Sequence, residues 1–197
     1  CEMLLKGRLK DITLEEYWLG KVVDIEDFQI EVTEDMVKCA EVYVEYIFKR
    51  KEELNATMVI EEKVYMDEIS DKCFGTADCI LIAEDRICVI DLKSGKWAVE
   101  ADNPQMRIYA LGALSRYGDD CTVQMTIVQP RGWHKDGPIR SYSISAINLV
   151  EWAYETLKPA AEACYEEIPT YNYSKDGCRW CNAKDACDTY KQNQKGD

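Results

Sequence analysis

Two aspartates and one lysine, Asp78, Asp91 and Lys93, are the residues of this 197-residue sequence best placed to do chemistry. They lie in two runs rich in Val, Ile and Cys that are joined by the charged pair Glu84-Asp85. If this pair is the loop of a β-hairpin, Asp78 lies directly opposite Asp91 on one face of the sheet. Lys93 projects from the same face, because side chains alternate along a strand. A one-residue change in the loop would move Asp78 to the other face.

Neighbouring carboxylates repel each other, and a divalent cation relieves that repulsion. Mg²⁺ prefers oxygen ligands, with water and substrate phosphate completing its shell. We therefore expect Asp78, Asp91 and the Leu92 backbone carbonyl to bind Mg²⁺ or Mn²⁺. Such a metal would acidify a bound water and stabilise charge on a phosphate, and Lys93 could orient or deprotonate that water. Asp-x-Lys is also common at solvated strand ends, and Asp78 could be a turn residue, so the hairpin alone leaves both interpretations open.

The helix expected over residues 104–117 supplies a second pair of polar groups. Asn103 can cap it, and Pro104 occupies its first position. Gln105 and Tyr109 are four residues apart and share one face near the helix N-terminus, where partial positive charge favours anions. Both could contact the backbone or a base of a nucleic acid. The alternative is a glutamine at the rim and a half-buried core tyrosine.

Together these motifs resemble those of a known nuclease superfamily. Gly75-Thr-Ala-Asp78, Asp91-Leu-Lys93 and Gln105-x-x-x-Tyr109 resemble motifs two and three and the Gln-x-x-x-Tyr motif of the PD-(D/E)XK nucleases. The similarity is greatest to the RecB-like branch, which includes the iron–sulfur nucleases of CRISPR adaptation, the AddB nuclease domain and uncharacterised phage and prophage proteins. It covers the stretch from about residue 58 to residue 117.

The resemblance implies roles for the five polar residues already named: two metal ligands, a catalytic lysine and two DNA-binding residues. It also implies a metal-binding histidine in an early helix. The one histidine of this sequence, His134, lies far downstream and does not match. Because the sequence opens on Cys1 within an expected helix, we expect the family histidine upstream of that residue.

A group of cysteines near the end of the chain has the spacing of metal ligands. Cys178, Cys181 and Cys187 give the pattern C-x₂-C-x₅-C, which suits an iron–sulfur cluster or structural zinc. In the iron–sulfur nucleases three late cysteines resemble this trio, and a fourth precedes the nuclease core. The resemblance thus implies a [4Fe–4S] cluster whose fourth ligand lies upstream, with Cys164 or His134 as alternatives within the sequence. Three free thiols on a polar surface are the simpler interpretation.

Composition limits the classes of protein and of partner. The formal charge of −13, from 24 basic and 37 acidic residues, argues against bulk electrostatic attachment to nucleic acid. No apolar run approaches the roughly 20 residues of a membrane-spanning helix. A secretory signal is also missing, so the ten cysteines indicate a reducing, cytoplasmic compartment of a bacterial host, where the protein could be phage-encoded. The cysteines in strand-like segments are expected to be small buried residues: Cys73, Cys79, Cys88 and Cys121.

Periodicity predicts an α/β fold with a mixed central sheet flanked by helices. The resemblance implies that this fold is of the restriction-endonuclease type. Helices are expected over residues 1–19, 33–51, 104–117 and 146–166, and strands over residues 58–65, 75–83, 87–93, 122–129 and 139–144. A nuclease-like core over residues 1–170 would precede a small cysteine-rich appendage over residues 171–197. Four aromatic residues near the end of the chain are expected to pack under that appendage rather than stack on bases: Tyr165, Tyr171, Tyr173 and Trp180.

The function predicted from these features is metal-dependent hydrolysis of phosphodiester bonds in DNA. The activity would be that of an exonuclease, or of an enzyme acting on ends or single strands, in phage or prophage DNA metabolism. DNA is the expected partner, together with a recombination or replication protein. Two alternatives stay open: a catalytically weak DNA-binding or recombination-partner module of the same fold, and a cysteine-based metal or redox sensor.

Overall fold

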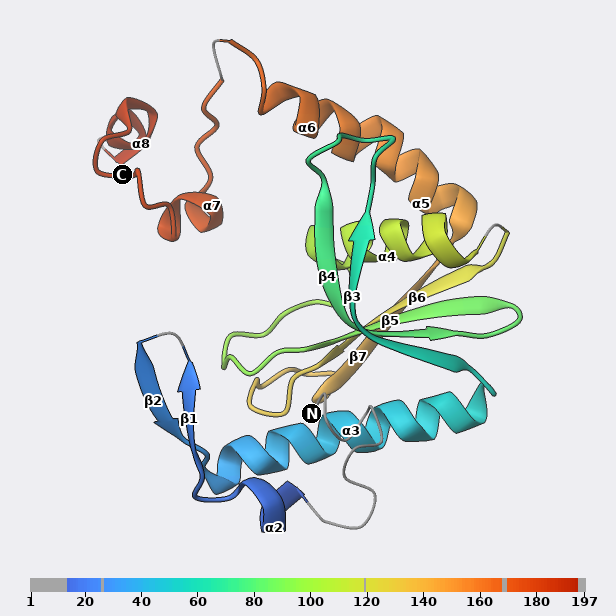
Figure 1. Cartoon of the computed structure of the whole chain (residues 1–197). Helices are drawn as coiled ribbons and strands as arrows, with labels where there is room; N and C mark the ends of the chain where they lie inside the picture. Colours follow the sequence, from blue (N-terminus) through green and yellow to red (C-terminus); the bar gives the residue numbers. More distant parts are fainter. Residues whose placement is uncertain (1–13, 26, 119, 168–169, 195–197) are drawn as a thin grey trace.

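The computed structural model describes residues 14–25, 27–118, 120–167 and 170–194 (Figure 1). Its helices are α2 (Leu14–Trp18), α3 (Glu34–Glu53), α4 (Pro104–Tyr117), α5 (Ala146–Trp152), the π-helical turn η1 (Ala153–Leu157), α6 (Lys158–Ala163), α7 (Lys175–Arg179) and α8 (Asp188–Gln194). Its strands are β1 (Val22–Ile25), β2 (Phe28–Glu31), β3 (Thr57–Tyr65), β4 (Phe74–Ile82), β5 (Arg86–Leu92), β6 (Thr122–Val128) and β7 (Ile139–Ser145).

A five-stranded sheet in the order β3-β4-β5-β6-β7 forms the centre of the molecule. Its neighbours pair antiparallel, except that β5 and β6 are parallel and are connected through α4. One face packs against α3 around Ile47, Leu81 and Ile90. The other face packs against α4 around residues such as Ile80 and Val89. The predicted mixed sheet flanked by helices is confirmed.

Two helices begin where the sequence predicts. The Thr33 side chain caps α3 by accepting a hydrogen bond from the Met36 N–H at 3.4 Å. The Asn103 side chain caps α4 by accepting from the Met106 N–H at 3.1 Å, and Pro104 stands in its first turn. This cap fixes the position of the first turn of α4, which is the part of the helix that faces the candidate site.

The hairpin of β4 and β5 has the predicted register. Ile82 lies opposite Ile87 and Cys79 lies opposite Ile90, and the Ala83 N–H donates to the Arg86 carbonyl at 2.9 Å. Continued by one residue, this register sets residue 78 opposite residue 91. The two-residue loop therefore places the two aspartates on neighbouring strands as the sequence predicts.

A sharp rotation of β3 and β4 occurs at the level of Asp78. The pairs Ile60–Cys79 and Glu62–Ala77 flank a residue of β3, Glu61, with a φ of 52°. Cys79 packs in the core beside α3, whereas Ala77 packs in the core beside α4. Residues two apart in an ordinary strand share one face, so the pair of strands turns over here. Asp78 thus sits at a bend rather than in a flat stretch of sheet.

The structure differs from the sequence-based expectations at both ends. Most of the helix expected over residues 1–19 lies outside the described residues, apart from α2. The hairpin of β1 and β2 was not predicted, because its four-residue strands are too short and too exposed to show alternation. The helix expected over residues 146–166 ends at residue 163 and contains the π-helical turn.

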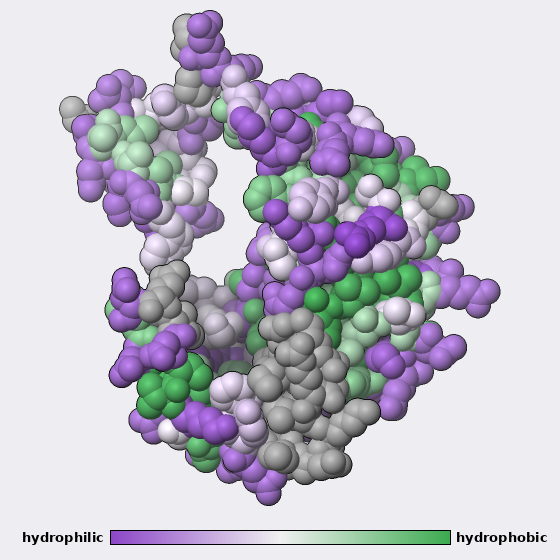
Figure 2. All heavy atoms as spheres, in the orientation of Figure 1, coloured by the Kyte–Doolittle hydropathy of each residue, from purple (hydrophilic) through white to green (hydrophobic). Residues whose placement is uncertain are grey.

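No disulfide bond joins the cysteines within the described ranges. Cys79 and Cys88 are buried among apolar side chains, as predicted, whereas Cys73 and Cys121 are only partly buried. The expectation that the late aromatic residues pack under the tail is wrong for three of them, which are exposed: Tyr165, Tyr171 and Trp180. Their segment leaves the body of the molecule after α6, and Figure 2 shows an opening between it and the body. No helix within the described ranges is long and apolar enough to cross a membrane.

Candidate functional site

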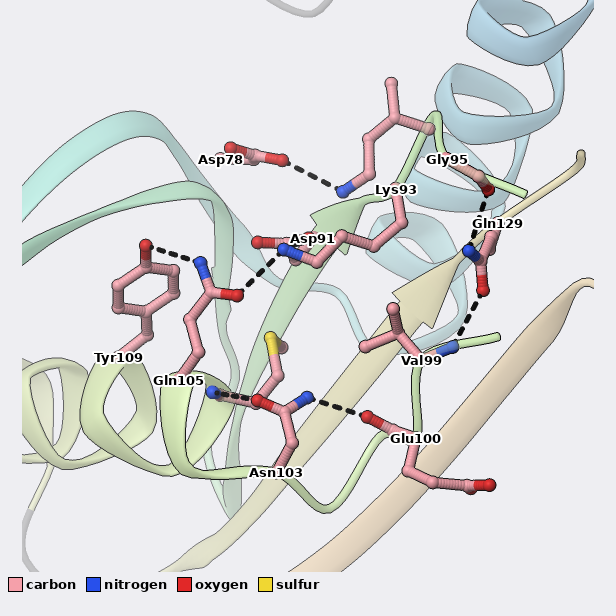
Figure 3. Close-up of polar contacts among 12 residues, drawn as sticks. Asp78, Asp91, Lys93, Gly95, Val99, Glu100, Asn103, Gln105, Tyr109 and Gln129 are labelled. Carbon is pink, nitrogen blue, oxygen red and sulfur yellow. Dashed lines mark hydrogen bonds and ion pairs between the residues drawn. The ribbon is translucent and has the colours of Figure 1, made fainter. Parts of the chain in front are cut away.

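The two predicted aspartates and the predicted lysine meet where the middle of β4 lies beside the end of β5 (Figure 3). The Lys93 ammonium nitrogen lies 2.9 Å from Oδ2 of Asp91. Asp78 accepts a hydrogen bond through its Oδ2 from the backbone N–H of Leu92, at 2.9 Å. The side chain of one aspartate therefore anchors the strand end that carries the other two groups.

A chain of hydrogen bonds joins this cluster to α4. The Lys93 ammonium donates to Oε1 of Gln105 at 2.8 Å, and Nε2 of Gln105 donates to the Tyr109 hydroxyl at 2.9 Å. The 3.6-residue period of α4 sets Gln105 above Tyr109 on the face turned to the hairpin (Figure 3). All five predicted polar residues thus belong to one continuous arrangement.

A glycine is required where β4 passes the tyrosine of this arrangement. A Cβ atom added to Gly75 would lie 2.3 Å from Cε1 of Tyr109, closer than real Cβ atoms approach other atoms. The aromatic ring therefore packs directly on the Gly75 backbone. This contact explains the glycine of the Gly-Thr-Ala-Asp segment by the close approach of α4.

Burial makes the two carboxylates costly to ionise. Asp91 is only 4% exposed, and burial raises its pKa; the Lys93 ammonium lowers the pKa, whereas the charge of Asp78 raises it further. Burial also raises the pKa of Asp78, against the opposing effects of the Leu92 N–H and of Lys93. A positive charge bound between these carboxylates would therefore be stabilising.

The donor set fits a hard divalent cation. Oδ2 of Asp91 is buried and accepts no hydrogen bond of standard geometry, although the Lys93 ammonium is near it. A buried acceptor left in this state is one that a cation can satisfy. Across the described part of the chain, no three His, Cys, Asp or Glu side chains form a group that could hold a metal ion. Two carboxylates therefore need the Leu92 carbonyl, water or substrate to complete a metal shell.

A second polar cluster, which sequence reasoning missed, holds the loop between Lys93 and α4. Gln129, which is fully buried, bonds to three backbone groups of that loop, and Arg140, 5% exposed, bonds to the same loop and to Gln129. The sequence offers no signal for this cluster, because its members come from β6, β7 and a loop that are distant in sequence. It fixes the backbone directly after the candidate catalytic lysine.

Within the described residues, the late cysteines do not form a cluster held together by side-chain hydrogen bonds or ion pairs, unlike the aspartates and the lysine. Cys178 and Cys187 are partly buried, and Cys181 is exposed. The possible fourth ligands have other contacts. The His134 ring accepts at Nδ1 from the Asp136 N–H at 3.1 Å, and its Nε2 lies 3.0 Å from Oε1 of Glu100. The predicted iron–sulfur or zinc site stays a prediction.

Comparison with known proteins identifies the family. Residues 1–196 match the model of a family described as "Protein of unknown function (DUF2800)", and the chain belongs to that family. The chain is also similar to a solved structure, that of SSO0001, with 17% sequence identity and a TM-score of 0.38. That match covers 78% of this chain and 70% of the other chain.

Proposed function

We propose that this member of the DUF2800 family is a divalent-metal-dependent nuclease of the PD-(D/E)XK type that hydrolyses phosphodiester bonds in DNA. The observation that carries the proposal is the single arrangement of Asp78, Asp91 and Lys93 with Gln105 and Tyr109 of α4. Two carboxylates, an ammonium group and two neutral polar groups are the groups that phosphodiester hydrolysis needs.

The metal would be held by the two aspartates and the Leu92 carbonyl. Mg²⁺ or Mn²⁺ suits this set because all the donors are oxygens and because two neighbouring carboxylates, one of them 4% exposed, face a single ammonium group. When bound, the metal supplies Lewis acidity toward water and the phosphate oxygens. The carboxylates contribute the negative charge that retains it.

Lys93 would act on the reacting groups directly. Its ammonium is held at two points, by Asp91 and by Gln105, so the side chain is oriented before the substrate arrives. From this position it can balance the negative charge that develops on the phosphate and orient the attacking water. Gln105 thus both positions the lysine and offers its amide to the substrate.

The substrate would lie along the exposed side of the hairpin and the first turn of α4. Gln105 is exposed and Tyr109 is partly exposed, so both can contact a DNA backbone or a base. We propose ends or single strands as the substrate and phage or prophage DNA metabolism as the context, with a recombination or replication protein as partner. The strongly acidic chain would bind DNA through this local site and its metal, since its overall charge is repulsive.

The three late cysteines are proposed to hold a [4Fe–4S] cluster together with a fourth ligand. Thiolates spaced as Cys178, Cys181 and Cys187 suit such a cluster. Structural zinc is the alternative for the same thiolates.

The proposal is tested by Lys93→Ala in a cleavage assay with Mn²⁺ and labelled linear and single-stranded DNA. The rate is expected to fall by about 10²–10⁴-fold, as when a group acting in the transition state is lost. The matched control is Lys96→Ala, which removes an exposed lysine from the same loop and leaves the cluster intact.

Metal binding is measured separately, from the rise in melting temperature with Mn²⁺. A ligand that binds only the folded chain stabilises it, and Asp91→Asn should abolish this rise. A wild-type protein that digests no DNA, while Mn²⁺ still stabilises it, would leave a DNA-binding module of this fold. Equal rates for wild type and Lys93→Ala would overturn the catalytic assignment.

A further inference from the structure

The loop that follows Lys93 carries a tryptophan whose side chain lies in solvent. Trp97 is 72% exposed, although tryptophan is among the most apolar contact surfaces a protein has. It lies four residues after Lys93, so their Cα atoms are at most about 14 Å apart. Stacked nucleotides rise by about 3.4 Å along a strand, so a strand bound at Lys93 can reach Trp97 within a few nucleotides.

The backbone on both sides of this tryptophan is fixed by one buried side chain. Nε2 of Gln129 donates to the Gly95 carbonyl at 2.8 Å (Figure 3) and to the Trp97 carbonyl at 2.6 Å. Oε1 of the same amide accepts from the Val99 N–H at 3.1 Å. Gln129 itself is 0% exposed. Every second residue from 95 to 99 is therefore tied to the end of β6.

A buried guanidinium reinforces the same loop. Arg140 donates to the Val99 carbonyl through Nε at 3.1 Å and through Nη2 at 2.7 Å. It also donates to Oε1 of Gln129 at 2.6 Å and to the Gly137 carbonyl at 2.8 Å. These acceptors are neutral, and burying a charged group on neutral partners is costly. These buried hydrogen bonds fix the backbone of the loop, although its largest side chain, Trp97, is mostly exposed.

One face of the exposed ring is near a positive charge. The Arg179 guanidinium lies 4.8 Å from the centre of the Trp97 ring and 5.2 Å from that of Trp180. An indole ring offers a π-face to any base, and an arginine beside it can contact the phosphate of the same nucleotide. The chemistry of this pair suits a single-stranded nucleic acid.

We propose that Trp97 is a binding site for an unpaired base of a DNA strand, and that Gln129 and Arg140 are positioning residues that hold it there. This deepens the proposed nuclease function and rests on it for the direction of the strand. A base that stacks on a ring carried by an already ordered loop costs less conformational entropy than one that must order the loop. This gives a reason for burying Gln129 and Arg140 beneath the loop.

The test measures binding without cleavage. A fluorescently labelled 15-nucleotide oligo(dT) is titrated with wild type, Trp97→Ala, Trp97→Phe and Phe28→Ala in the absence of divalent metal, and its anisotropy is followed. Trp97→Ala is expected to weaken binding by about 5- to 100-fold, and Trp97→Phe to retain most of the affinity. Phe28, which is 68% exposed on the hairpin of β1 and β2, is the matched control and should have no effect.

The positioning role is tested by Gln129→Glu. The new carboxylate can still accept from Arg140 and Val99, so the protein should fold, but it cannot donate to the Gly95 and Trp97 carbonyls. Oligo(dT) affinity should fall toward that of Trp97→Ala, and the melting temperature should fall as well, because the buried Gly95 and Trp97 carbonyls lose their donor. If Gln129→Glu melts far lower, acrylamide quenching of Trp97 in a Trp97-only variant decides whether the loop has moved.

The outcomes separate this site from the nuclease proposal. Equal oligo(dT) affinity for wild type and Trp97→Ala overturns the stacking site, whether or not the protein cleaves DNA, and points to a protein partner for the exposed ring. Loss of affinity in Trp97→Ala, with a wild type that cleaves nothing in Mn²⁺, overturns the nuclease proposal and leaves the stacking site standing.

Discussion

The sequence predicts metal binding in two regions of the molecule, and their structures differ. The first region is the hairpin of β4 and β5 together with α4. The second is the cysteine segment that includes α7 and α8. In the first, Asp91 is 4% exposed and is linked through Lys93 and Gln105 to Tyr109. In the second, neither helix contributes a buried residue. One motif is assembled by the fold itself, and the other is a short segment on the surface.

The two candidate metal sites differ in what brings their ligands together. The aspartates are placed by a hairpin register and the polar pair of α4 by a helical period, and both are properties of the backbone. The cysteines would be brought together by the ion that they bind, because metal binding and local folding are coupled in such segments.

The largest expected effect is on the stability of the first region. Gln129→Met keeps the volume of the buried side chain but leaves three backbone groups of the loop after Lys93 without their partner. Buried groups left unsatisfied are costly, so the free energy of unfolding should fall by about 3 kcal/mol. Urea denaturation followed by circular dichroism measures the change.

The matched substitution in the second region is Gln194→Met. Gln194 is exposed on α8, and its amide only donates to the Tyr173 hydroxyl at 3.4 Å. Its replacement should leave the unfolding of the sheet unchanged. Equal effects of the two substitutions would show that the loop after Lys93 is no better anchored than the tail.

A smaller effect is expected at the contact of Gly75 with Tyr109. In Gly75→Ala the new methyl group overlaps the ring of Tyr109, and overpacking of this kind costs about 1–3 kcal/mol. The displaced tyrosine should also lose its bond to Gln105, so that cleavage slows in the same variant. Thermal unfolding and the Mn²⁺-dependent rate measure the two consequences.

Gly95→Ala is the control, since nothing lies within 4 Å of a Cβ atom at that position. The same exchange there should change the melting temperature by no more than an ordinary surface substitution. A melting temperature of Gly75→Ala equal to that of wild type would mean that the ring of Tyr109 is free to move away.

Much of the site could be predicted from the sequence because its geometry follows from periodic patterns. The register of β4 and β5 and the cap at Asn103 follow from local sequence. The rotation of the sheet at Asp78 and the bonds of Gln129 and Arg140 could not be predicted. They depend on which distant segments pack together, and neither residue type nor spacing marks them.

The charge of Asp78 is expected to destabilise the metal-free protein at neutral pH. Burial raises its pKa above the ordinary value of 3.8, so the wild type loses stability as the pH rises from that value through the raised pKa. Asp78→Asn can still accept from the Leu92 N–H and removes this loss. Its free energy of unfolding should exceed that of wild type at pH 7 and approach that of wild type at pH 3.

Asp85 in the hairpin loop gives the opposite sign. The Arg86 guanidinium donates hydrogen bonds to this carboxylate and lowers its pKa. The ionised carboxylate therefore stabilises the folded chain at a pH above the ordinary pKa of the group. This stabilisation is lost as the pH falls through the lowered pKa. Asp85→Asn should therefore be slightly less stable than wild type at pH 7.

Added Mn²⁺ should make the wild type more stable than Asp78→Asn, because only the wild type retains both carboxylates.

The smallest effect is expected in the cysteine segment without metal. Changing Cys178, Cys181 and Cys187 together to serine should alter the unfolding of the metal-free sheet by less than about 0.5 kcal/mol, because none of the three is buried. Purified without oxygen, the same triple variant should lack the iron and the visible absorption expected of the wild type. Since a bound cluster would order the segment around these cysteines, the loaded wild type should resist proteolysis after α6 and the variant should not. Iron content that is equal in the two proteins would place the cluster elsewhere, and a colourless, metal-free wild type would leave these cysteines as free thiols on the surface.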